Sequence, residues 1–168
     1  WSLAEKIKNG KASVLGAVTG SIAGLAAITP ASGEVGPIGA LAIGAASGLV
    51  CWYASVILKS KLGYDDSLDV VGVHGVGGLV GTILVAFFAA STFGGKRSVE
   101  VVGDERGYEW GSQLMTQLTS SAITVVYTLV LSIIILKVVG VVCGGLRVSE
   151  SEEQDGLDIS AHGESGYN

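Results

Sequence analysis

The chain has 168 residues, of which 49% are hydrophobic and only 15% charged, and it contains 26 glycines. A typical soluble domain has about 25% charged residues and about 7% glycine, so this composition argues against one and favours a membrane protein with closely packed helices. The net charge of −5 belongs mainly to the C-terminus, because six of the 15 acidic residues follow Ser149. The sequence has no basic, aromatic-rich patch, so no nucleic-acid partner is expected.

Four segments are long and apolar enough to cross a bilayer, which requires about 20 residues per helix. In chain order they are residues 12–30, 38–58, 70–90 and 112–143. The fourth contains one charge, Lys137, near its end, where a long side chain can reach the interface. We therefore predict an all-α integral membrane protein with four transmembrane helices.

The loops between these segments carry unequal positive charge. If each segment spans once, six Lys and Arg residues lie on the side of the C-terminus and three on the other. The positive-inside rule then places the C-terminus in the cytoplasm. The six are Lys6, Lys8, Lys11, Lys59, Lys61 and Arg147, and the three are Lys96, Arg97 and Arg106.

Small residues recur at four-residue intervals within the segments and therefore share helix faces. Such faces let a neighbouring backbone approach closely, which predicts tightly packed helices. The runs are Gly16, Gly20 and Gly24; Ala40, Gly44 and Gly48; Gly77 and Gly81; and Gly140 and Gly144.

His74 is the only ionisable residue between Val70 and Ala90. An ionisable side chain inside a membrane is costly and is a functional candidate by default. Two interpretations stay open on helical geometry alone: a neutral imidazole that hydrogen-bonds for packing, or a group on a transport path that accepts a proton from a weak acid such as ammonium. No metal or other cofactor is expected, because no second ligand lies at suitable spacing on this face.

Asp69 lies five residues before His74, about 140° away around an ideal helix, so the two are not expected to share a face. It follows Asp65, Asp66 and Ser67. Acidic residues at a helix start satisfy free N–H groups and complement the helix dipole. We expect Asp69 to be a structural residue of the helix start.

Three separated motifs resemble the bacterial Amt side of the Amt/Rh ammonium transporter family. Residues 65–78 (DDSLDVVGVHGVGG) resemble its tenth transmembrane helix, and residues 24–33 (GLAAITPASG) resemble its eighth helix and the loop that follows. Residues 144–148, followed by residues 156–158 and 162–164 with Tyr167, are similar to its cytoplasmic C-terminal region. The resemblance implies that residues 1–145 correspond to helices eight to eleven and residues 146–168 to a cytoplasmic regulatory tail.

The resemblance also implies a homotrimer of eleven-helix subunits, built from inverted repeats, in the cytoplasmic (inner) membrane. Each subunit would carry ammonium through its own hydrophobic pore, lined by two paired His residues, with deprotonation of ammonium and passage of ammonia. His74 matches the second of this pair, and Val70 would line the pore one turn toward the cytoplasm. The first pore His would lie upstream of Trp1, so a C-terminal fragment is expected.

Two further functions are weighed against transport. An ammonium sensor that signals through the tail is the alternative hypothesis. An enzyme is not indicated, because no nucleophile–base pair, metal cluster or phosphate loop accompanies His74.

The acidic tail is by composition a solvated segment. The resemblance implies instead a regulatory region that responds to a PII-type nitrogen regulatory protein. The tail residues carried over from the resemblance are Gly145, Asp158, His162, Gly163 and Tyr167.

Overall fold

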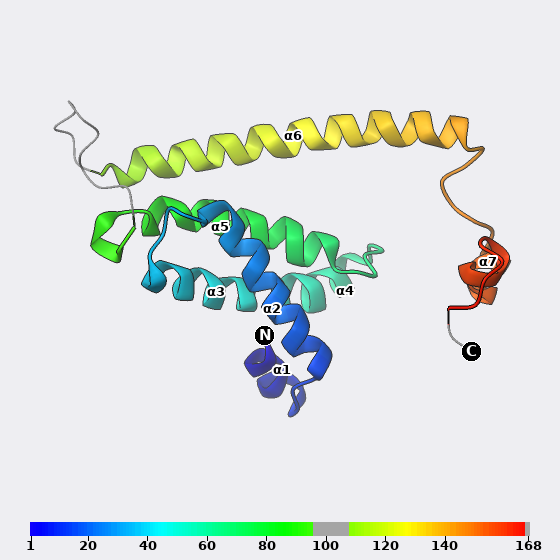
Figure 1. Cartoon of the computed structure of the whole chain (residues 1–168), viewed down its shortest axis with the longest axis horizontal. Helices are drawn as coiled ribbons and strands as arrows, with labels where there is room; N and C mark the ends of the chain where they lie inside the picture. The colour runs from blue at the N-terminus through cyan, green and yellow to red at the C-terminus, as the bar shows by residue number, and fades with distance from the viewer. Residues whose placement is uncertain (96–107, 167–168) are drawn as a thin grey trace. The chain divides into compact units, whose positions relative to one another are not determined.

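A computed structural model describes residues 1–95 and 108–166, and within these ranges the secondary structure is helical, with no strand. The chain divides into two units, residues 1–122 and 123–168. Figure 1 labels most of the helices. In chain order the elements are α1 (Ser2–Asn9), α2 (Val14–Ile28), the 3₁₀ turn η1 (Thr29–Ala31), α3 (Pro37–Trp52), the π-helix η2 (Tyr53–Leu58), α4 (Lys59–Leu62), the π-helix η3 (Val70–Gly75), α5 (Val76–Phe88), the 3₁₀ turn η4 (Ser91–Phe93), α6 (Trp110–Val142), α7 (Glu150–Asp155) and α8 (Leu157–Ser160).

Four helical stretches are long and apolar enough to cross a membrane: Val14–Ala31, Pro37–Leu62, Val70–Phe88 and Trp110–Val142. The predicted number of spans and the all-α membrane fold class are confirmed. The second stretch runs further than predicted, because α4 continues the helix until Gly63 ends it in the left-handed region. The last stretch is one helix of 33 residues, about 50 Å long.

Local chemistry sets where these helices begin and end. The Ser13 hydroxyl accepts the N–H of Gly16 at 2.8 Å and so caps the start of α2. Pro30 follows at the other end, where a residue without an N–H cannot continue the helix. Pro37 opens α3, because its fixed φ suits a first helical turn.

Helices α2, α3 and α5 pack against one another through buried residues spaced by four (Figure 1). A Cβ atom at Gly81 would overlap the backbone carbonyl of Ala27, so the two backbones are in direct contact there. At Gly77 a Cβ would lie 3.3 Å from the Cys51 sulfur. The buried series are Ala23, Ala27 and Ala31 in α2 with η1, Ile43, Ser47 and Cys51 in α3, and Gly77, Gly81 and Val85 in α5.

The predicted run of small residues packs in α5, whereas in α2 and α3 only part of each run does. In α2, an added Cβ at Gly16 or Gly20 would overlap Glu5 or Trp1, and in α3 Gly48 is buried. Gly24 and Gly44 belong to the predicted runs, yet a Cβ added at either would meet nothing within 4 Å among the described residues. Both helices carry small residues on several faces, so spacing alone did not select the face that packs.

Buried polar groups join these helices as well. The Ser47 hydroxyl donates to the carbonyl of Ala23 at 2.7 Å, which connects α3 to α2. The Cys51 thiol lies 3.8 Å from the carbonyl of Val73 and donates to it, which connects α3 to η3. Each bond satisfies a polar group that is removed from water.

Large apolar side chains point outward from this bundle. Leu15 in α2 and Leu41 in α3 are each 76% exposed, whereas the buried positions hold mostly small residues. A soluble protein rarely exposes so much apolar surface. The pattern fits contact with lipid or with further apolar helices.

An aromatic cluster closes the end of α5. The Tyr108 hydroxyl donates to the carbonyl of Ala86 at 2.7 Å. The Trp110 ring lies within 6.1 Å, centroid to centroid, of the rings of Phe87, Phe93 and Tyr108. Aromatic residues concentrate at membrane interfaces, so this end of α5 suits the edge of a bilayer.

The contact at Gly81 yields a stability prediction. In most helix interiors replacing Gly by Ala stabilises by about 0.5–1 kcal/mol. Gly81→Ala should do the reverse and lower the free energy of unfolding by about 1–3 kcal/mol, because the new methyl group meets backbone that cannot move aside. Unfolding in detergent micelles, followed by circular dichroism, measures the change. Gly78→Ala is the matched control, since open space surrounds that position; equal effects of the two substitutions would contradict the prediction.

Candidate functional site

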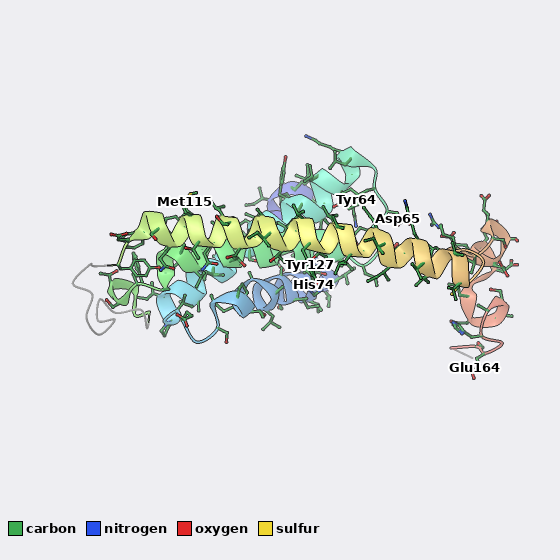
Figure 2. All side chains as sticks on the ribbon, turned by 90° about the horizontal axis from the view of Figure 1, so that it is seen from above. Tyr64, Asp65, His74, Met115, Tyr127 and Glu164 are labelled. Carbon is green, nitrogen blue, oxygen red and sulfur yellow. The ribbon has the colours of Figure 1, made fainter. Side chains whose placement is uncertain are left out.

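His74, labelled in Figure 2, lies in η3. Its side chain is exposed. Val70, four residues earlier, is 54% exposed, and Gly78, four residues later, has open space where a side chain would be. The three form an open face that is apolar except for the imidazole. We call Val70, His74 and Gly78 the His74 face. It lies on η3 and α5, away from the buried Gly77 and Gly81.

The other side of η3 is packed. Gly72 and Val73 are buried, and a Cβ at Gly72 would overlap the hydroxyl of Ser55 in η2. The two π-helices therefore touch at this point. Wide π turns are rare and occur frequently at functional sites.

The His74 imidazole forms no hydrogen bond or ion pair within the part of the chain that the structure describes. An imidazole that serves packing would be buried and would have a partner among these helices. This part of the chain therefore offers no support for the packing interpretation. No group of three or more potential metal ligands occurs among residues 1–95 and 108–166.

The helix start before His74 is built by two carboxylates with different partners. Asp69 occupies the N-cap position, as expected, but its side chain makes no capping bond. The Asp66 carboxylate instead accepts the N–H groups of Val70 at 2.8 Å and Val71 at 2.9 Å. Asp69 contributes its carbonyl, which accepts the N–H of Val73 at 2.8 Å.

The Asp69 carboxylate pairs with the Lys59 ammonium group. The same ammonium group donates to the carbonyl of Asp66 at 3.0 Å. In the sequence, Lys59 counts only as one of the positive charges that predict which side of the membrane faces the cytoplasm. A lysine at the end of one span, close before a run of three aspartates that opens the next, was the signal that could have suggested the pair.

The angular argument about Asp69 and His74 assumed a regular α-helix. The structure has a π-helix there, whose i→i+5 bonding brings residues five apart closer to one face. Asp69 itself adopts a left-handed conformation with φ 53°, and its carboxylate is bound to Lys59. No hydrogen bond joins the Asp69 carboxylate to the His74 imidazole in the described residues, so a direct side-chain relay is absent there.

The C-terminal unit contains a short folded tail. Ser149 and Glu152 form a capping box at the start of α7, in which each side chain bonds the other's backbone N–H. Gly145 and Gly163 adopt positive φ, at 147° and 67°, a backbone conformation that glycine accepts at no steric cost.

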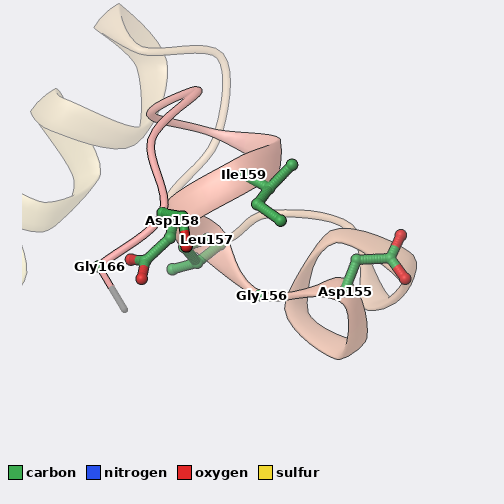
Figure 3. Close-up of a pocket in the computed structure, with 7 residues that line it drawn as sticks. Asp155, Gly156, Leu157, Asp158, Ile159 and Gly166 are labelled. Carbon is green, nitrogen blue, oxygen red and sulfur yellow. The ribbon is translucent and has the colours of Figure 1, made fainter. Parts of the chain in front are cut away.

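The remaining predicted tail residues lie around α8. The backbone carbonyl of Asp158 accepts the backbone N–H of Glu164 at 2.9 Å. His162 is exposed, and its backbone N–H donates to the carbonyl of Leu157 at 3.2 Å. Tyr167 lies outside the described residues. A hollow of about 370 Å³ is lined by residues of this region (Figure 3), namely Asp155, Gly156, Leu157, Asp158, Ile159, Ser165 and Gly166.

Comparison with known proteins identifies the family. The sequence profile of the Ammonium Transporter Family matches residues 1–167. The chain belongs to this family. The resemblance seen in the motifs is thereby confirmed, and membership assigns the chain to a family of transporters rather than enzymes.

Named ammonium transporters are similar to nearly all of this chain. The *Mycobacterium tuberculosis* H37Rv protein is 44% identical over 99% of the chain, the *Bacillus subtilis* protein 42% over 99%, and the *Aquifex aeolicus* protein 41% over 100%. The chain covers 35%, 40% and 38% of these relatives, respectively. It therefore spans well under half of the length of the ammonium transporters it matches.

The helix start carries a testable consequence. Asp66→Ala removes the acceptor of two backbone N–H groups and should lower local stability by about 0.5–2 kcal/mol, the usual loss for an N-cap. Hydrogen exchange at the Val70 and Val71 amides should then become faster. Asp65→Ala, one residue earlier, is the control, and equal exchange in the two variants would contradict the assignment of Asp66 as the cap.

The capping box predicts a pH dependence. The hydroxyl and backbone N–H of Ser149 hold the pKa of Glu152 below its usual 4.5. The cap therefore stabilises α7 above the pKa that Glu152 has in the unfolded tail, and this contribution is lost as the pH falls through the lower, folded value. Ser149→Ala should raise the pKa of Glu152 toward the usual value, as measured by carboxyl NMR. Ser160→Ala, which removes a hydroxyl from α8, is the control and should leave the pKa of Glu152 unchanged.

Proposed function

We propose that the whole protein carries ammonium across the cytoplasmic membrane and that this chain supplies His74 and Val70 to an apolar conduction path. The observation that carries the proposal is an exposed imidazole, without a partner among the described residues, on an otherwise apolar face of a membrane-length helix. Membership of the chain in the Ammonium Transporter Family supports ammonium as the substrate.

The physical reason for a His-lined path is the cost of moving a cation through an apolar region. A full charge taken out of water without compensation is strongly disfavoured, whereas neutral ammonia avoids that cost. A neutral imidazole can accept a proton or a hydrogen bond from ammonium and so assist its deprotonation. Ammonia would then cross the apolar region, and the proton would move separately. Potassium has no proton to lose and would be excluded.

The His74 face supports this chemistry by its composition. Val70 is apolar and Gly78 has no side chain, so the face offers no side-chain oxygen beside the imidazole that could replace the water around a cation. The face is open within these helices and requires further helices to form a closed path. By the family resemblance these would bring the first pore His, in a subunit that assembles as a homotrimer.

The orientation and the tail belong to the same proposal. Lys59 and Lys61 lie at the end of the second span, and the positive-inside rule favours the cytoplasm for that side. The C-terminus would then be cytoplasmic. There the folded tail, with Gly145, Asp158, His162, Gly163 and Tyr167, would meet a PII-type regulatory protein, as the resemblance implies.

Replacement of His74 tests the transport role. In the whole protein reconstituted into liposomes, His74→Ala should lower the ammonium-driven current at least about tenfold, as expected when a positioned proton acceptor is lost. It should also weaken the exclusion of potassium. Leu79→Ala, a truncation on the same helix outside the His74 face, is the control. An undiminished current with unchanged potassium exclusion would rule out this role. A wild-type protein that binds ammonium but conducts none would favour the sensor hypothesis.

A further inference from the structure

We propose that Lys59 is a positioning residue for conduction, which joins the two π-helices η2 and η3 and thereby sets the place of the His74 imidazole. The inference rests on the proposed function of His74. It adds a residue from a neighbouring span that touches neither substrate nor imidazole and acts through the backbone of η3.

The first support is the position of Lys59 between the two π-helices. Lys59 directly follows η2, and Asp69 directly precedes η3. The Lys59 ammonium group binds the Asp69 carboxylate and the carbonyl of Asp66. One side chain thus ties the end of the first π-helix to the start of the second. The two side chains are 27% and 26% exposed, so the pair is partly sheltered from water.

The second support is a set of contacts further along the same two helices. Gly72 lies against the Ser55 hydroxyl so closely that no Cβ would fit. The Cys51 thiol donates to the carbonyl of Val73. These contacts hold the packed side of η3, and the Lys59–Asp69 pair holds the residue directly before it, so η3 is fixed at its start and along its buried side.

The third support is the backbone conformation of Asp69. Its φ of 53° makes it the only non-glycine residue with positive φ in the described ranges. Asp tolerates this left-handed region better than most residues, yet such a conformation persists only where its surroundings hold it. The ion pair with Lys59 holds the Asp69 side chain. The Asp66 carboxylate holds the N–H groups of the two residues that follow Asp69, and together these contacts supply the restraint.

Release of Asp69 would move His74. A π-helix contains a wider turn than an α-helix, and its conversion to regular α-helix changes the register by one residue. One residue corresponds to about 100° around an α-helix. With Gly77 still packed, the turn that carries Val70 and His74 would rotate relative to α5, and the line that Val70, His74 and Gly78 share would be broken.

The decisive experiment replaces Lys59 by Met, which keeps much of the side-chain length and removes the charge. In the whole protein in liposomes, Lys59→Met should lower the ratio of ammonium to potassium conductance by about tenfold to about 10²-fold, the loss typical of a reacting group displaced by about an ångström. Hydrogen exchange at the amides of residues 70–76 should become faster. Lys59→Arg preserves the charge and should retain most of the ratio.

Lys61→Met is the matched control, because Lys61 lies in the same short helix, is exposed and has no partner among the described residues. It should leave both readouts unchanged. If Lys59→Met fails to fold, Asp69→Asn decides, because Asn also tolerates the left-handed conformation and removes only the charge: a lowered ratio supports the proposal, and an unchanged ratio overturns it.

The readouts separate the two proposals. Unchanged selectivity and exchange in Lys59→Met, together with loss of current in His74→Ala, would overturn the role of Lys59 and leave the function of His74 standing. The positioning role would also be overturned if Lys59→Met lost current only in proportion to the amount of folded protein lost and kept the ratio of ammonium to potassium conductance. If His74→Ala conducts normally, the conduction role of His74 fails first, and the positioning role fails with it.

Discussion

The close approach of the α5 backbone to α2 and α3 is the constraint on which the rest of the structure depends. Gly81 meets the backbone of Ala27, and Gly77 meets Cys51, so the points of closest approach between these helices have room only for small residues. Large apolar side chains consequently point outward, where lipid or further helices can cover them. The same contact turns Gly77 and Gly81 inward and leaves the His74 face open.

Regular helix gives way to wider turns where the polar chemistry lies. The two π-helices meet at Ser55 and Gly72, and the second of them carries His74. Asp66 and Lys59 organise its first residues through bonds to the backbone and to Asp69. An apolar face with one imidazole is thus supported at its start by the polar bonds among Lys59, Asp66 and Asp69, and such supporting contacts are what a precise site requires.

Several features could be predicted from residues alone, and others could not. The four spans follow from apolar length, which a bilayer demands of any sequence. The packed face of Gly77 and Gly81 was predicted because the two glycines lie four residues apart and so share one side of a helix. The runs predicted in α2 and α3 pack only in part, since both helices carry small residues on several sides and the contact with α5 uses other positions. The helix cap was expected at Asp69, because three neighbouring aspartates are equivalent in a sequence and only the backbone path brings Asp66 to the free N–H groups.

The sequence by itself determined the class of the molecule: its helical membrane segments, its single intramembrane histidine and the motifs of its family. These depend on composition, on length and on local order, all of which are present before folding. The tertiary structure decided which side of each helix packs, that His74 stays on an open face, and that Lys59 closes on Asp69. Such relations join residues in different helices or depend on a left-handed residue and wide turns, and no regular helical period encodes them.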